Sequence, residues 1–147
     1  MKFRELKQED INAVKNDSIS RGILSKQPEI IDYSYCLEHE GKVLGIGGIR
    51  LINETSCWLW VDLTHYAKEH IITVYRVISE WLEILMKDKG IVRAQCYVEM
   101  DFEEAIRLVK HLGLRYESTM PNFVDKKPAY MYVRFFGVFD DICDKQV

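Results

Sequence analysis

A strand, a long amphipathic helix and a second strand follow one another between residues 57 and 98, and this succession constrains the fold more than any other feature. The run 57–63 is almost continuously apolar, as expected of a central strand buried on both faces. Apolar residues then recur at helical spacing over 71–85, Gly90 ends the helix, and 91–98 is a second strand. Because strand–helix–strand crossovers are right-handed and join parallel strands, we expect these strands to be parallel neighbours that diverge at their carboxyl ends.

Hairpins and shorter helices are predicted around this crossover. Further strands are expected at 2–6, 33–40, 43–52, 114–119 and 129–136, and helices at 10–15, from Asp17 to before Pro28, and from Asp101 to Leu112. Three glycines within 43–52 indicate a bulge or a close backbone approach. The last helix begins with a D-x-x-E signal that resembles a capping box, and a polar loop containing Pro121 and Pro128 separates the last two strands. This order predicts an α/β protein with a mixed, mostly antiparallel sheet and helices on both faces.

Composition narrows the class of protein and its partners. The chain has 147 residues, which predicts one domain over 1–139 followed by a polar tail at 140–147. A net charge of -3 argues against a nucleic-acid surface, and no apolar run reaches the length of a membrane span. The four cysteines are far apart, form no CxxC pair and follow no apolar signal segment, so we expect reduced thiols and a cytoplasmic protein.

Two local runs resemble the N-acetyltransferase (GNAT) superfamily. EGKVLGIGGI, residues 40–49, is similar to its second hairpin, and AIRLVKHLGL, residues 105–114, to its late helix and exit. The resemblance covers nearly the whole chain and implies the GNAT fold, with acetyl-CoA as the cofactor and an unidentified small-molecule or protein amine as the acceptor. A narrower resemblance, to small GNAT-like proteins of tailed phages, rests on the compact helix pair and on a junction without glycine.

That junction departs from the family pattern. The superfamily grips the cofactor pyrophosphate with a glycine-rich loop, which we place over residues 68–73, and this segment contains no glycine. The helix start still supplies backbone N–H groups and a positive dipole end, but Ile71 crowds the phosphates and Glu69 repels them. The resemblance therefore implies weak or absent acetyl-CoA binding, through a set of residues at the strand end and helix start: Leu63, Thr64, Lys68, His70, Ile71, Ile72 and Thr73.

Candidate catalytic residues lie at the carboxyl ends of the two central strands. Acetyl transfer needs a base near the amine, and the candidates are the carboxylates Asp62, Glu99 and Asp101, together with Tyr97. Asp62 is the preferred base, because it interrupts an otherwise apolar strand end. A capping or solvated strand-end carboxylate is the competing interpretation for each acid. The usual tyrosine acid of the late helix is replaced by Val109, and Tyr116 is nearby only in sequence. No metal site is expected, because the cysteines and histidines match no zinc spacing.

Two functions from different classes stay open. One is an N-acyltransferase that moves an acetyl group from acetyl-CoA to an amine. The other is a non-catalytic GNAT-fold interaction protein, which the degraded loop and the phage resemblance favour. The aromatic strand 129–136 also predicts a homodimer, on the expectation that it lies at a sheet edge.

Overall fold

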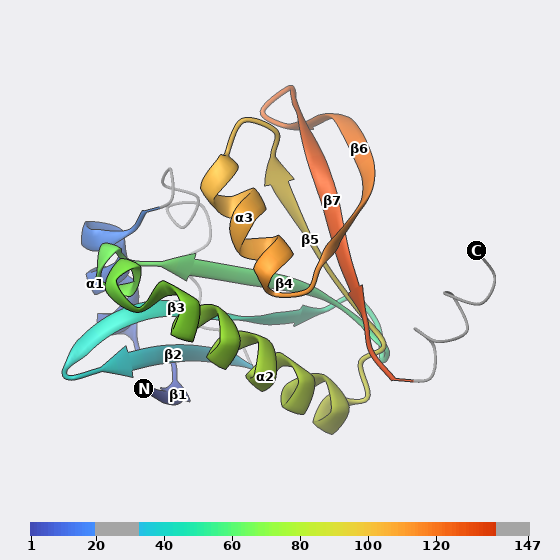
Figure 1. The fold of residues 1–147 in the computed structure, drawn as a ribbon. Helices are drawn as coiled ribbons and strands as arrows, with labels where there is room; N and C mark the ends of the chain where they lie inside the picture. Colours follow the sequence, from blue (N-terminus) through green and yellow to red (C-terminus); the bar gives the residue numbers. More distant parts are fainter. Residues whose placement is uncertain (20–32, 138–147) are drawn as a thin grey trace. The chain divides into compact units, whose positions relative to one another are not determined.

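The computed structural model describes residues 1–19 and 33–137, and Figure 1 follows the chain through its elements. The predicted second helix lies outside the described residues from residue 20 onward, and its predicted start, Asp17, is the last residue of the first helix. The tail 140–147 also lies outside the described residues. The strands and helices run in this order: β1 (Lys2–Glu5), α1 (Gln8–Asp17), β2 (Ser34–His39), β3 (Lys42–Leu51), β4 (Ser56–Leu63), the 3-10 helix η2 (His65–His70), α2 (Ile71–Lys89), β5 (Arg93–Glu99), α3 (Glu103–His111), β6 (Arg115–Val124) and β7 (Lys127–Phe135).

The strands form one seven-stranded sheet in the order β1-β2-β3-β4-β5-β7-β6. Its β1–β2, β2–β3, β5–β7 and β6–β7 ladders are antiparallel, and the β4–β5 ladder is parallel. The predicted α/β fold class and the parallel central pair are therefore confirmed. The parallel ladder covers only Ser56 to Trp58 of β4, paired with Arg93 to Gln95 of β5, although both strands continue.

The chain forms two compact units that alternate in sequence. The first comprises Met1–Arg50 and Leu59–Val74, and the second comprises Leu51–Trp58 and Tyr75–Val147. The carboxyl half of β4 therefore belongs to the first unit and β5 to the second, so the predicted divergence of the two strands stays a prediction.

In the first unit, α1 packs its apolar stripe on the β1–β2–β3 strands. Ile11 and Val14 of α1 join Leu6, Cys36 and Ile46 in a buried cluster. The glycines of β3 allow neighbouring strands to approach closely, as predicted: a Cβ on Gly47 would lie 2.7 Å from the Trp60 carbonyl oxygen. The β2–β3 ladder also contains the predicted bulge: Leu37 pairs with Gly45 and Glu38 with Val43, so Leu44 of β3 is the extra residue.

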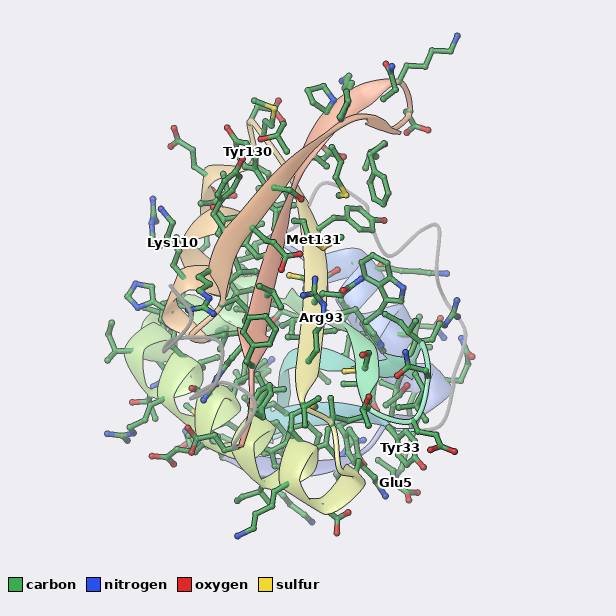
Figure 2. The ribbon with its side chains drawn as sticks, turned by 90° about the vertical axis from the view of Figure 1, so that its right-hand side faces the viewer. Glu5, Tyr33, Arg93, Lys110, Tyr130 and Met131 are labelled. Carbon is green, nitrogen blue, oxygen red and sulfur yellow. The ribbon has the colours of Figure 1, made fainter. Side chains whose placement is uncertain are left out.

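In the second unit, the side chains of the β5–β7–β6 sheet alternate between two faces. Tyr130 lies toward Lys110 of α3, whereas Arg93 of β5 lies on the other side (Figure 2). Arg134 of β7 ties the sheet to the helices, because its guanidinium donates to the Leu112 carbonyl at 2.9 Å and to Glu83 of α2 at 2.7 Å.

The last hairpin differs from its prediction. β6 and β7 run past both prolines and are joined by only Asp125 and Lys126, which both have positive φ as in a type I′ turn. Pro121 is tolerated because β6 is an edge strand with a register shift between Met120 and Val124, and Pro128 precedes the residues that pair with β5. β7 lies between β5 and β6, so the edge-strand argument for a homodimer is wrong.

The start of α3 also differs. Its N-cap is Phe102, one residue after the predicted Asp101, and the Phe102 side chain makes no cap hydrogen bond. Two acids, Glu103 and Glu104, occupy the first turn and complement the helix dipole.

Candidate active site

Asp62 and Thr64 occupy the carboxyl end of β4 in the first unit and are both buried. The Ser18 hydroxyl donates to the Asp62 carboxylate at 2.6 Å, and Asp62 is only 4% exposed. The Thr64 hydroxyl donates to the Val43 carbonyl at 2.7 Å, and the Thr64 N–H to the Leu44 carbonyl at 2.9 Å. These contacts fix the strand end to α1 and β3, so the Asp62 carboxylate is held inside the unit rather than presented at its surface.

The backbone becomes helical at His65, ahead of the segment where the pyrophosphate loop was placed. The 3-10 helix η2 starts from Thr64, with the Ala67 N–H donating to the Thr64 carbonyl at 3.1 Å, and it continues directly into α2, since Ile71 has helical φ and ψ. The N–H groups of residues 70–73 thus have carbonyl oxygens three or four residues behind them, which compete for them. The open N–H groups of a helix start, on which the prediction depended, are displaced toward His65.

In residues 68–73, side chains are better placed than backbone N–H groups to contact a phosphate. Lys68 and His70 are exposed and cationic or protonatable, whereas Ile72 is 70% exposed and offers no polar contact. Ile71 and Thr73 are half-buried, and Leu63 is buried. Any phosphate contact in this segment would therefore come from the side chains of Lys68 and His70, beside the exposed negative charge of Glu69, and not from a glycine-type cradle.

Tyr97 and Glu99 belong to the second unit and lie two residues apart on one face of β5. Tyr97 is 37% exposed, and its ring makes edge-to-face contacts with Trp58 at 6.2 Å and with Phe123 at 5.0 Å between centroids. Glu99 is half-buried at the end of the strand. A half-buried carboxylate beside an exposed aromatic face suits proton exchange with an amine better than a carboxylate already bound by a hydroxyl group.

The late helix, α3, contains no tyrosine that could replace the missing acid. Val109 is buried, and Tyr116 is exposed, with its hydroxyl 2.7 Å from that of Thr119. His111 of α3 stacks on Tyr75 of α2, with ring centroids 4.5 Å apart. In the second unit, Tyr97 is the tyrosine that shares a face of β5 with the candidate base Glu99.

Three cysteines sit in strands, as predicted, and are buried free thiols: Cys36 in β2, Cys57 in β4 and Cys96 in β5. Burial raises the pKa of each to about 12, so none is a nucleophile. Cys143 lies outside the described residues. Over 1–19 and 33–137, no group of three or more His, Cys, Asp or Glu could hold a metal ion, and no helix is long and apolar enough to span a membrane.

Solved structures resemble this fold over nearly its whole length. Ard1 from Thermoplasma volcanium matches with a TM-score of 0.72 and 18% identity, covering 92% of this chain and 97% of that one. The ribosomal-protein-S18-alanine N-acetyltransferase from Escherichia coli matches at 0.66 and 16%, covering 90% and 91%. YncA, a putative acetyltransferase from Salmonella typhimurium with its cofactor acetyl-CoA, matches at 0.66 and 15%, covering 91% and 92%. No family model matches the sequence, and no curated protein does.

These matches show that the chain has the GNAT fold. They give no support to the narrower resemblance to phage proteins. Sequence reasoning missed Ser18, the partner of Asp62, because a contact between residues 44 positions apart leaves no local pattern. It also missed His39 at the end of β2, whose ring contacts the ring of His70 at the end of η2.

Proposed function

We propose that this protein is an N-acetyltransferase that moves the acetyl group of acetyl-CoA to an amine. The observation that carries the proposal is the fold: a parallel β4–β5 pair joined by α2, in a sheet that matches solved acetyltransferases over at least 90% of the chain. Acetyl-CoA, when bound, supplies an activated thioester carbonyl. One of the matching structures, YncA, was solved with its cofactor acetyl-CoA, which supports the same donor here.

Glu99 is the proposed base. The amine nitrogen forms a bond to the acetyl carbon as the carbon–sulfur bond breaks, the amine proton passes to Glu99, and the leaving thiolate takes up a proton. Tyr97, on the same face of β5, is the proposed donor of that proton, because Val109 cannot supply one. Asp62 is proposed to hold the end of β4 through Ser18 rather than to act as the base.

The acceptor is proposed to be an amine on a small molecule or a protein. One matching enzyme is a ribosomal-protein-S18-alanine N-acetyltransferase, but it shares only 16% of its residues with this chain, so its acceptor is not transferred. The exposed aromatic face formed by Trp58, Tyr97 and Phe123 would contact the acceptor.

The experiment is a titration with acetyl-CoA monitored by melting temperature, followed by measurement of thiol release with a panel of amines. A ligand that binds only the folded state stabilises it by about 2.7 kcal/mol at a concentration of 100 times its Kd. We expect stabilisation, and thiol release that falls at least about 100-fold in the Glu99→Gln variant. Acetyl-CoA that neither stabilises the protein nor is consumed would overturn the proposal.

The second candidate is a non-catalytic interaction protein that keeps the fold. The continuous helical backbone from His65 through α2 favours it, because a pyrophosphate cradle needs open backbone donors. Under this proposal, acetyl-CoA fails to bind in the original chain and also when glycines are placed at the junction.

A further inference from the structure

The tip of the β2–β3 hairpin meets the helical run of the first unit through ionisable side chains. The rings of His39, at the end of β2, and His70, at the end of η2, lie edge to face with centroids 5.1 Å apart. The Lys42 ammonium, at the start of β3, lies 4.9 Å from the centroid of the Tyr66 ring in η2. The β2–β3 hairpin and η2, which are distant in sequence, thus bring cationic or protonatable side chains close together.

The charge of this place is set by two lysines, two carboxylates and two imidazoles. Lys42 and Lys68 carry positive charge, and Glu40 and Glu69 in the same segments carry negative charge, so these four groups balance. A proton on the imidazole of His39 or His70 would make the surface positive. Other charged groups are nearby: His65 begins η2, Asp17 faces His65 at 3.9 Å, and Lys2 of β1 pairs opposite Glu38, the neighbour of His39.

Among residues 1–19 and 33–137, no strong partner holds the ring nitrogens of His39 and His70. The carboxylate oxygen of Glu40 is 3.9 Å from His39 Nε2, beyond hydrogen-bond distance, and Glu40 is 83% exposed. His39 is 30% exposed and His70 is exposed, so solvent or a ligand reaches both rings. Two protonated imidazoles at this separation repel each other, and an anion that contacts both would offset the repulsion.

We propose that His39, Lys42 and His70, with the exposed Lys68 of the same helix η2, bind the phosphate groups of a polyphosphate ligand more tightly at low pH. We call these four residues the hairpin-tip surface. This inference rests on the proposed function, because it assigns the pyrophosphate of acetyl-CoA to side chains in place of the missing glycine loop. The hairpin tip lies beside the carboxyl end of β4, where η2 begins. Val43 and Leu44, directly after Lys42, accept hydrogen bonds from Thr64, which precedes η2.

The test is calorimetry of the full chain with inorganic pyrophosphate at pH 6 and pH 8. The reference is the double variant His39→Gln with His70→Gln, measured at both pH values, so that the ionisation of pyrophosphate itself cancels in each ratio of Kd values. We expect the double variant to bind at least about tenfold more weakly than the original at pH 6, and within about threefold of it at pH 8. The matched control is His111→Gln, which removes an exposed imidazole stacked on Tyr75 in the second unit and should leave binding unchanged.

Three results would overturn the proposal: no pyrophosphate binding at pH 6, the same pH dependence in the double variant, or an equal loss in His111→Gln. Thermal melts of each variant check that it is folded. A parallel titration with acetyl-CoA separates this proposal from the proposed function. Histidine-dependent pyrophosphate binding without acetyl-CoA binding or turnover leaves the surface standing and removes acetyl transfer. If the double variant still binds acetyl-CoA tightly, the proposed function stands and the proposal for the hairpin-tip surface fails.

Discussion

Replacing Ser18 by alanine tests whether Asp62 has a structural or a catalytic role. The Ser18 hydroxyl donates to a carboxylate that is 4% exposed, at 2.6 Å, so its loss removes a charge-assisted bond from a buried anion. Such a bond contributes about 1.5–3 kcal/mol. We expect Ser18→Ala to lower the free energy of unfolding by that amount and Ser18→Thr, which keeps a hydroxyl, to restore much of it.

The assay is urea unfolding followed by circular dichroism, with turnover measured on the same samples. For a small protein with an m-value of about 2 kcal/mol/M, the expected loss lowers the urea midpoint by about 1 M. At temperatures where every variant is folded, Ser18→Ala should keep kcat/KM within about threefold, whereas Glu99→Gln should lose at least about 100-fold. An unchanged midpoint in Ser18→Ala would refute the structural role. A fully stable Asp62→Asn protein with a loss of turnover of about 100-fold would make Asp62 the base.

Two further predictions concern the stability of the first unit. Arg4→Met should cost about 3–5 kcal/mol near neutral pH, because it leaves the carboxylate of Asp10, which is 3% exposed, without the guanidinium that contacts it at 2.7 Å. Burial opposes ionisation of Asp10, but the hydrogen bonds from Arg4 and the Lys7 backbone outweigh it and lower its pKa below 3.8, so this contribution is present above about pH 4 and is lost as pH falls further. Unfolding curves at pH 7 and pH 3 should show the gap between Arg4→Met and the original shrinking, and a constant gap would contradict the assignment. Gly48→Ala should cost about 1–3 kcal/mol or more, because its Cβ would collide with the Tyr33 carbonyl oxygen, whereas the control Gly41→Asn, at a turn with no atom within 4 Å, should cost less than about 1 kcal/mol in the same assay.

Patterns that depend on neighbouring residues were enough to predict most of the fold. The apolar run ending in Leu63 and the helical spacing after Ile71 predict the parallel β4–β5 pair, because the crossover rule leaves no other arrangement. The glycines of β3 predict close strand contacts, and the structure places Gly47 and Gly48 against backbone oxygens. These signals are local or follow from general chain topology, so one sequence contains them.

Features that depend on contacts distant in sequence escaped the prediction. Pro121 and Pro128 indicated a loop, but the edge position of β6 and its register shift tolerate Pro121, and sequence spacing reveals neither. The 3-10 helix before Ile71 has no distinct sequence signal, so the helix start was placed too late. The pairing of His39 with His70 depends on how the hairpin tip meets η2, which periodicity does not encode.

Glycines at the junction test whether the site is degraded or absent. Ile71→Gly combined with Glu69→Gly removes a β-branched side chain and a negative charge, and it weakens the helical backbone by about 1 kcal/mol per glycine. In the structure these residues continue a helix that starts at His65, so the glycines must also release backbone N–H groups from intrahelical bonds.

If phosphates are bound mainly by backbone donors, the double glycine variant should bind acetyl-CoA at least about tenfold more tightly in calorimetry, equivalent to about 1.4 kcal/mol. If they are bound by the hairpin-tip surface, Ile71→Gly alone should change affinity less than about threefold because it alters no charge. Any tightening should then come from Glu69→Gly, which removes a negative charge, and Lys68→Ala should weaken binding. The structure favours the second result, because His39, Lys42, Lys68 and His70 are charged or protonatable side chains that the glycine substitutions leave in place. Tightening by the glycines with no effect of Lys68→Ala would show that backbone donors, and not these side chains, hold the phosphates.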